Sequence, residues 1–352
     1  MVNLFGMGSA ELSELAEALG EPPFRARQLY SWLYRQRVPD IDAMTDVRKD
    51  LRARLAETHE LRWPGVEERR SSMDGSIKYL FRLDDGASIE SVYIPSDKRQ
   101  TICISTQAGC PLKCGFCLTG VAGYTRNLRP WEILGQVAVV MHEAPASTRP
   151  WNVVLMGMGE PLLNVDATLA SLRILMDKRG FAVAPRKLTL STVGILPALE
   201  RLAQEPVRPA LAISLHAPNA ELRRALMPVD ERYPLEAVVA AARRYPGPAG
   251  GWVTYEYTLL GGVNDSPSQA RELVGLLAGS RCKVNLIPLN PAPEIPFVPP
   301  SEAALDAFCR VLAGSGLNVS VRRSRGQDIL AACGQLHLHR RAQIAGADAP
   351  GA

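Results

Sequence analysis

Four of the chain's cysteines lie within fifteen positions of one another, and three of them are closely spaced. Cys110, Cys114 and Cys117 form a C-x3-C-x2-C pattern. Thiolates a few residues apart can bind one soft metal centre. Three protein ligands leave one position open, which suits either a four-iron cluster with one accessible iron or a catalytic zinc ion. The spacing favours the cluster over zinc, and both over three inert core thiols.

Polar residues and glycines recur at the ends of short apolar segments. These segments alternate with helix-like stretches over roughly 200 residues, which predicts a parallel sheet in a full or partial (β/α) barrel. Active sites in such barrels lie at the carboxyl ends of the strands, so we expect the polar residues to point into the barrel mouth. The predicted strands cover residues 101–106, 152–160, 187–194, 210–217, 253–262, 283–290 and 318–324.

Four regions are predicted along the chain. Residues 1–62 carry helical periodicity and form an N-terminal helical domain. Its arginines lie among aromatic residues, which suits either RNA contacts or a solvated helix face with the aromatics turned inward. Residues 63–95 predict a β-hairpin linker, because alternating runs flank Asp84-Asp85-Gly86. The barrel follows over 96–330, and 331–352 is a C-terminal segment that carries Cys333 and a disordered tail.

Composition excludes several classes of protein. The 352 residues suit a globular protein with a large core, and a net charge of +4 says little about partners. Seven cysteines do not indicate a secreted disulfide framework. Residues 1–20 lack the basic-then-apolar order of a signal peptide, so we expect none there, and no apolar run reaches the roughly 20 residues that span a bilayer. We therefore expect a cytoplasmic protein without a membrane segment.

The cysteine pattern, placed after the first barrel strand, resembles the radical S-adenosylmethionine superfamily. Other stretches narrow the resemblance to the RlmN family of RNA adenine-C2 methyltransferases, and together they cover nearly the whole chain in order. They read GMGEPLLN, LSTVG, AISLHAPN, NLIPLNP and RGQDILAACGQL. The resemblance implies a partial TIM-like barrel, a [4Fe-4S] cluster on the three cysteines, and two molecules of S-adenosylmethionine per turnover. The implied cofactor contacts are Gly159, Glu160, Ser191, Ser214, Leu215, His216 and Asn290, with Gly159 and Glu160 at the methionine end.

The resemblance also implies roles for residues that look ordinary by themselves. Cys103 and Cys333 could each be small buried hydrophobes, and Glu90 an outward residue of a strand. In the family, the cysteine that matches Cys333 is methylated, and a 5′-deoxyadenosyl radical then removes hydrogen from that methyl group. The carbon radical adds to adenine C2, the base matching Glu90 takes the C2 proton, and Cys103 releases the RNA by forming a disulfide.

The family's substrates imply the partners. They are an adenine of 23S rRNA in the peptidyl-transferase region and, in many bacteria, the adenine 3′ to the tRNA anticodon. Flavodoxin or ferredoxin is the expected electron donor, and the protein is expected to be a monomer. Basic residues near Cys333 could contact phosphates or form solvated surface. They are Arg322, Arg323, Arg325, Arg340 and Arg341.

Two alternative functions remain open at this point. A Cfr-type relative would methylate C8 of the same rRNA adenine with the same cysteines, although RGQDI looks closer to the C2 enzymes. A non-catalytic RNA-binding protein stabilised by zinc would leave Cys103 and Cys333 without a role. Zinc without sulfide would favour this second alternative.

Overall fold

A ten-stranded mixed sheet forms the centre of the computed structural model, which describes residues 1–248, 251–323 and 325–329. Seven of its strands run parallel, in the order β14-β13-β12-β11-β10-β9-β6. Each falls within or overlaps a predicted strand segment, so the predicted strand–helix alternation is confirmed. They are β6 (Gln100–Cys103), β9 (Trp151–Leu155), β10 (Leu188–Thr192), β11 (Ala210–Ser214), β12 (Val253–Leu259), β13 (Cys282–Pro288) and β14 (Asn318–Val321).

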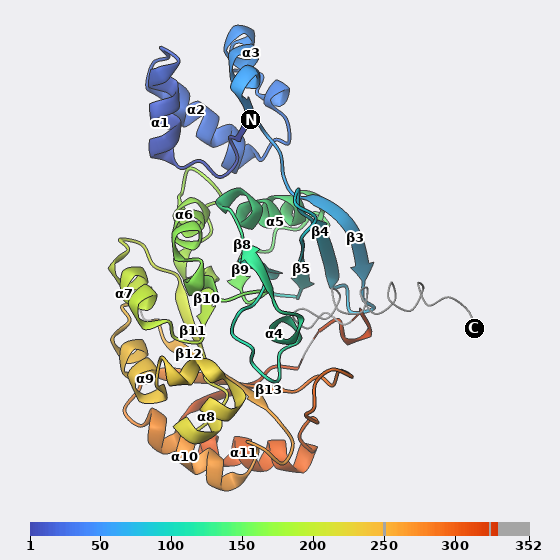
Figure 1. Cartoon of the computed structure of the whole chain (residues 1–352), viewed down its shortest axis with the longest axis vertical. Helices are drawn as coiled ribbons and strands as arrows, with labels where there is room; N and C mark the ends of the chain where they lie inside the picture. Colours follow the sequence, from blue (N-terminus) through green and yellow to red (C-terminus); the bar gives the residue numbers. More distant parts are fainter. Residues whose placement is uncertain (249–250, 324, 330–352) are drawn as a thin grey trace, which may run out of the picture.

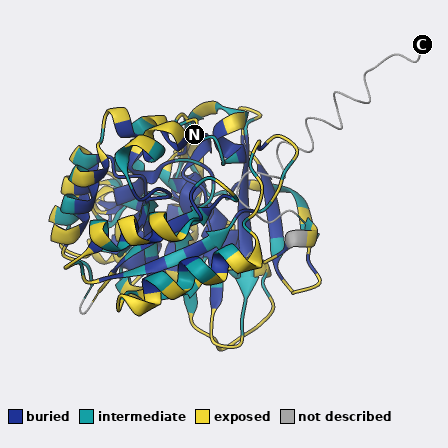
Figure 2. Cartoon of the chain, turned by 90° about the horizontal axis from the view of Figure 1, so that it is seen from below, coloured by how far each residue is buried: buried dark blue, intermediate teal, exposed yellow. Residues whose placement is uncertain are grey.

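Helices cover the outside of this curved sheet (Figure 1). In Figure 2 their outer sides are exposed, whereas the strands that they surround are buried. The edge strands β14 and β3 pair with one neighbour each, so the described sheet is an open barrel. The covering helices are α5 (Pro130–Glu143), α6 (Val165–Met176), α7 (Leu196–Gln204), α8 (Ala220–Leu226), α9 (Leu235–Arg244), α10 (Pro267–Leu277) and α11 (Glu302–Gly314).

The predicted hairpin is present as β4 (Ile77–Arg82) and β5 (Ser88–Pro95), joined by a turn at Asp84-Asp85-Gly86. It is not a linker, however. A further strand, β3 (Gly65–Ser71), pairs with β4, and β5 pairs antiparallel with β6. The three strands therefore extend the main sheet, because the backbone groups of β5 complete the hydrogen bonding at the β6 edge of the barrel.

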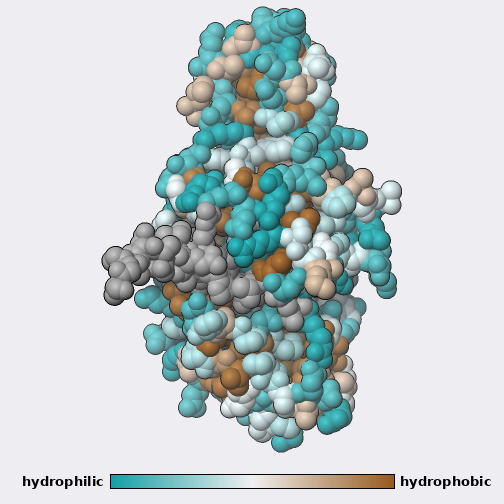
Figure 3. All heavy atoms as spheres, turned by 90° about the vertical axis from the view of Figure 1, so that its right-hand side faces the viewer, coloured by the Kyte–Doolittle hydropathy of each residue, from teal (hydrophilic) through white to brown (hydrophobic). Residues whose placement is uncertain are grey.

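An N-terminal lobe stands beside one end of the barrel (Figure 1). Figure 3 shows a waist between this lobe and the rest of the molecule. The arrangement confirms the helical character predicted for this region. Its elements are β1 (Val2–Asn3), α1 (Ser9–Ala18), α2 (Phe24–Tyr30), a π-helical turn over Ser31–Gln36, a 3-10 turn over Ile41–Ala43, α3 (Lys49–Thr58) and β2 (His59–Glu60).

Two tyrosines of the lobe face inward, whereas Phe24 is 47% exposed. Tyr30 and Tyr34 are buried, and the Tyr34 hydroxyl accepts a hydrogen bond from the Gly6 amide and donates one to the Met7 carbonyl. The Tyr34 ring also packs against Phe181 of the barrel, with 6.0 Å between ring centroids. These two tyrosines therefore join the lobe to the barrel and are not free to stack on RNA bases. In the described part of the chain, no helix has the length and apolar character needed to cross a bilayer.

Candidate cofactor and cysteine site

The three spaced cysteines lie on one loop between two short antiparallel strands, β7 (Gln107–Gly109) and β8 (Tyr124–Asn127). The Cys110 amide donates to the Gly123 carbonyl at 2.8 Å, which closes the base of the loop. Cys117 begins the short helix α4 (Leu118–Ala122) as its N-cap, and its amide donates to the Cys114 carbonyl at 3.2 Å. The backbone thus holds all three thiols on one compact turn after the first parallel strand, as the sequence predicted.

The surroundings of these thiols fit a bound cationic group. A cavity of about 480 Å³ is lined by Cys110 and Cys114 together with Lys113, Gly120 and other loop residues. Burial raises the pKa of Cys110 to about 12 and also raises that of Cys114, so neither thiolate is favoured without a metal centre. Within the described residues, no three His, Cys, Asp or Glu side chains are arranged to hold a single metal ion. Cys110 and Cys114 line this cavity, and Cys117 lies on the same loop, so the three cysteines would suit a cluster that takes one ligand from each of them.

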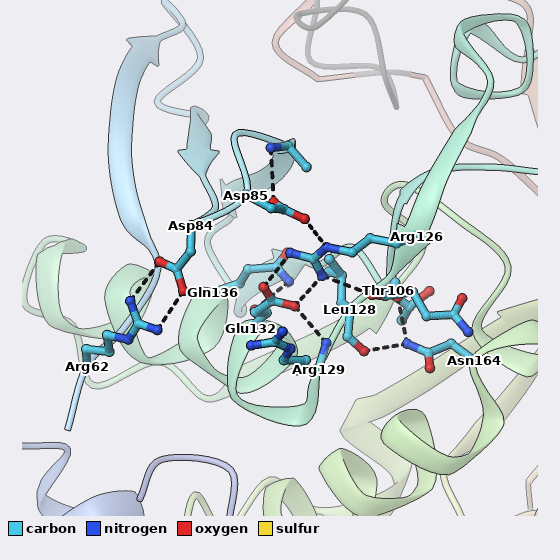
Figure 4. A network of polar contacts seen from close by, with 12 residues as sticks. Arg62, Asp84, Asp85, Thr106, Arg126, Leu128, Arg129, Glu132, Gln136 and Asn164 are labelled. Atoms are coloured by element: carbon cyan, nitrogen blue, oxygen red, sulfur yellow. Dashed lines mark hydrogen bonds and ion pairs between the residues drawn. The ribbon is translucent and has the colours of Figure 1, made fainter. Parts of the chain in front are cut away.

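A network of ion pairs anchors the strand that follows this loop (Figure 4). The Arg126 guanidinium on β8 donates two hydrogen bonds of 2.8 Å to the buried carboxylate of Glu132 on α5. It also pairs with Asp85 at the tip of the β4–β5 turn. The Glu132 carboxylate accepts a further bond of 2.7 Å from the Arg129 amide. Because bidentate arginine–carboxylate pairs fix orientation, the network holds β8 against both α5 and the hairpin.

The glycines of the predicted Gly-Met-Gly-Glu motif allow two strand ends to pack closely. A Cβ on Gly157 would lie 2.7 Å from the Ser105 hydroxyl oxygen and the Ile104 carbonyl. Gly159 has a φ of +96°, and a Cβ there would lie 2.5 Å from the Gln107 side chain. Gly157 is therefore required by the contact of the β9 loop with the residues after β6, and Gly159 by its contact with Gln107 of β7, whatever the loop binds.

Glu160 follows these glycines and is buried. Its carboxylate accepts hydrogen bonds from the backbone amides of Leu162, at 3.0 Å, and Val193, at 2.9 Å. Burial raises its pKa to about 7, although these bonds and one from the Thr192 side chain oppose the rise. The carboxylate thus connects the β9 loop to the end of β10, in addition to any contact that it makes with a cofactor.

The remaining predicted contacts lie at the ends of neighbouring strands. The hydroxyl oxygens of Ser191 on β10 and Ser214 on β11 are 3.3 Å apart. Leu215 is fully buried, and its amide donates to the Glu256 carbonyl at 3.0 Å. Asn290 lies just past β13 and is half-buried. The strand order therefore brings these predicted residues together at the carboxyl ends of the parallel strands.

The geometry of His216 defines its protonation state. Its Nδ1 atom accepts a hydrogen bond of 2.9 Å from the Thr258 amide, and its ring packs 4.7 Å, between centroids, from Phe116 of the cysteine loop. Burial, aided by the positive charge of Arg223, lowers its pKa to about 3. The imidazole is therefore neutral, and the acceptor role of Nδ1 places the proton on Nε2.

Sequence reasoning missed a buried ion pair beside this site. Arg223 on α8 and Asp230 in the 3-10 turn Pro228–Glu231 are both fully buried, and 2.6 Å separates Arg223 Nη1 from Asp230 Oδ1. A second Arg223 nitrogen donates to the Val193 carbonyl at 2.7 Å. Because the Val193 amide is bonded to Glu160, this pair helps to fix both strand ends. No feature of the sequence distinguishes Arg223 from its neighbour Arg224.

Arg223→Met is expected to lower the free energy of unfolding by about 3–5 kcal/mol, since it leaves the Asp230 carboxylate buried and unpaired. Arg224, the next residue of the same helix, is exposed and supplies a matched control. Arg224→Met should change stability by less than about 0.5 kcal/mol. Urea unfolding of both variants measures the difference. Equal effects would show that the buried pair contributes no more than a surface arginine.

The two described residues of the predicted catalytic set lie on adjacent strands. Glu90 on β5 is 4% exposed, and Cys103 on β6 is 8% exposed. Cys103 pairs in register with Val92, two residues beyond Glu90, so Cys103 and Glu90 point to the same face of the sheet. The Ser105 hydroxyl donates to the Glu90 carbonyl at 2.6 Å. Cys333 lies outside the described residues.

The described members of the predicted basic cluster, Arg322, Arg323 and Arg325, are exposed, and each makes a contact within the chain. Arg323 pairs with Glu302, at 2.8 Å between the closest atoms, and an Arg322 nitrogen lies 3.6 Å from the Met156 sulfur on the opposite side of the barrel. An Arg325 nitrogen lies 3.4 Å from the Pro95 carbonyl. Phosphate contacts by these three arginines stay a prediction. Arg340 and Arg341 lie outside the described residues.

The segment that leads toward Cys333 is held by the turn between β3 and β4. The Asp328 carboxylate accepts hydrogen bonds from the Ser72 hydroxyl, at 2.6 Å, and from the Met73 amide, at 3.1 Å. In the opposite direction, the Gly326 amide donates to the Asp74 carboxylate at 2.9 Å. Asp328 is thus an anchor of this segment, a role that the sequence did not reveal.

Comparisons with known proteins agree with this geometry. Residues 2–61 match the model of the ribosomal RNA large subunit methyltransferase N-terminal domain, and residues 104–274 match that of the radical SAM superfamily. The chain is 47% identical to the dual-specificity RNA methyltransferase RlmN of Marinobacter nauticus over 95% of its own length and 92% of the relative's. It also resembles the crystal structure of a radical SAM methyltransferase from Sphaerobacter thermophilus, with 46% identity and a TM-score of 0.90. That match covers 95% of this chain and 99% of the other. The chain therefore belongs to the RlmN family of radical S-adenosylmethionine RNA methyltransferases.

Proposed function

We propose that this protein methylates C2 of an adenine in 23S rRNA and of the adenine 3′ to the anticodon in tRNA. The observation that carries the proposal is the 47% identity, over nearly the whole of both chains, to a dual-specificity RNA methyltransferase. The proposed setting is the cytoplasm, with the protein acting as a monomer. Flavodoxin or ferredoxin is the proposed source of electrons.

The proposed cofactors are a [4Fe-4S] cluster and two molecules of S-adenosylmethionine per turnover. When bound, the cluster supplies the electron that cleaves S-adenosylmethionine. Cys110, Cys114 and Cys117 would hold the cluster, and the cavity lined by Cys110 and Cys114 supports this assignment. The cofactor would lie along the strand ends, where Gly159, Glu160, Ser191, Ser214, Leu215, His216 and Asn290 are the proposed contacts.

Three side chains would act on the adenine. Cys333 would carry the methyl group to C2 and remain joined to the base through a thioether. The Glu90 carboxylate would take the C2 proton, and the unpaired electron of the radical adduct would pass to a one-electron acceptor, which restores the aromatic ring. Cys103 would then bond to the Cys333 sulfur as the sulfur–methylene bond breaks, and its thiol hydrogen would complete the methyl group. The shared sheet face of Glu90 and Cys103 supports this division of roles.

Mass spectrometry of RNA tests the function directly. The gene should be expressed in a host that lacks its own adenine-C2 methyltransferase, and 23S rRNA and tRNA then digested to nucleosides. We expect 2-methyladenosine in both RNAs, and none when Cys333→Ala is expressed instead. Detection of 8-methyladenosine would support the C8 alternative, which the comparisons do not favour. Absence of both nucleosides would overturn the proposal.

A further inference from the structure

Lys78 on β4 is a lysine with no exposed side-chain surface. Its Nζ atom lies 3.7 Å from the Glu90 Oε2 atom, and the Glu90 side chain is 4% exposed. Burying a lysine ammonium is costly unless an opposite charge accompanies it. Most lysine side chains are exposed, so the complete burial of Lys78 beside a carboxylate suggests a specific role for the pair.

The strand register puts this pair on the face that carries the catalytic residues. Lys78 pairs with Val92 on β5, and Val92 pairs with Cys103 on β6. Glu90 is two residues from Val92, so its side chain points the same way. Lys78, Glu90 and Cys103 therefore occupy one sheet face, with Lys78 diagonal to Glu90 across neighbouring strands.

Three other charged residues, Glu68, Arg70 and Arg322, make contacts of their own. On β3, Arg70 and Glu68 form an ion pair of 2.7 Å with each other, and they lie in register with Lys78 and Leu80. From the far side of the barrel, Arg322 reaches Met156 of the β9 loop. Cys103 is the titratable group that faces Glu90 from β6. Lys78 is thus the cation that the described structure pairs with Glu90.

We propose that Lys78 is a positioning residue that keeps the Glu90 carboxylate ionised and directed toward the substrate adenine. This inference rests on the proposed function, in which Glu90 takes the C2 proton. After the carbon–carbon bond forms, loss of the C2 proton to Glu90 and of one electron to a one-electron acceptor restores the aromatic ring. Because this gain of aromaticity favours proton loss, the step requires an ionised carboxylate more than a strong base. Lys78 keeps its own proton throughout, and the pair passes from neutral to a single positive charge when Glu90 is protonated.

Removing the lysine charge has a defined electrostatic consequence. A carboxylate as buried as Glu90 is disfavoured in its ionised form unless a cation compensates it. Loss of the ammonium therefore raises the pKa of Glu90, and each unit by which that pKa exceeds the pH of the assay lowers the ionised fraction about tenfold. Activity that depends on ionised Glu90 should then return as the pH is raised.

The test compares Lys78→Gln, Lys78→Met, Lys78→Arg and Glu90→Gln as full-length, cluster-loaded proteins. Methylation of RNA is measured from acidic to alkaline pH, and the methyl group on Cys333 is measured by peptide mass spectrometry. For Lys78→Gln we expect normal Cys333 methylation, RNA methylation about tenfold or more below wild type at neutral pH, and partial recovery at alkaline pH. Lys78→Arg keeps the charge and should retain the wild-type pH profile. Lys78→Gln also keeps a hydrogen-bonding group, so it serves if Lys78→Met fails to fold.

The outcomes separate the inference from the proposed function. Full RNA methylation by Glu90→Gln would overturn the role of Glu90 as the base. An inactive Glu90→Gln together with a wild-type rate and pH profile for Lys78→Gln would overturn the role of Lys78 alone. Equal loss at every pH, accompanied by loss of Cys333 methylation, would show that Lys78 only supports the fold.

Discussion

Replacing any one of Cys110, Cys114 or Cys117 with alanine is expected to abolish cleavage of S-adenosylmethionine. The wild-type protein, reconstituted without oxygen, should bind about four irons and four sulfides per chain. The three cysteines lie on one loop, where Cys110 and Cys114 line the cavity, so each cysteine would supply a ligand that no neighbour replaces. Iron and sulfide analysis measures the loss, and the appearance of 5′-deoxyadenosine under reducing conditions measures cofactor cleavage.

Cys309 on α11 provides the control for the loss of a cysteine outside the cysteine loop. It is half-buried and lies on a covering helix, far in sequence from the cysteine loop. Cys309→Ala should keep the full content of iron and sulfide and should still cleave the cofactor. Stoichiometric zinc without sulfide, in wild-type protein purified without oxygen, would contradict the cluster assignment and favour a zinc site.

The parallel strands were predictable from sequence because each is a short apolar run bounded by glycine or polar residues. The segment over Gly65–Ser71 was not, since GVEERRS lacks an alternating apolar pattern. Its place as β3 is set by pairing with β4, where Arg69 on one face bonds Glu143 of α5. The hairpin was recognised from its turn, yet its attachment to β6 depends on tertiary contacts that no local pattern encodes.

The candidate site also contains some residues that the sequence predicted and others that it did not. Spacing identified Cys110, Cys114 and Cys117 because the metal ligands of one loop are local in sequence. Lys78 and Arg223 are different, since each is buried only through partners on other elements. A charged residue in a strand or helix predicts an exposed side chain by default. The sequence therefore carries no sign that these two are interior.

Cys103 and Cys333 are expected to give different products when each is replaced with alanine, because their proposed roles fall at different stages. Cys333→Ala should yield neither methylated protein nor methylated RNA, since it lacks the sulfur that carries the methyl group. Cys103→Ala should still be methylated on Cys333 and should still join the adenine, but it cannot form the disulfide that releases the product. A covalent protein–RNA adduct should therefore accumulate.

A denaturing gel detects this adduct as a shifted band. The band should survive reductant, because a thioether is not reduced by thiols. It should disappear on ribonuclease treatment. Cys282→Ala is the matched control for packing. Cys282 is a buried cysteine on β13, 3% exposed against 8% for Cys103, and it has no proposed chemical role. A buried cysteine that only packs should cost about 1–3 kcal/mol of stability when truncated, with no adduct. Normal turnover by Cys103→Ala, without the shifted band, would reduce Cys103 to the same packing role as Cys282.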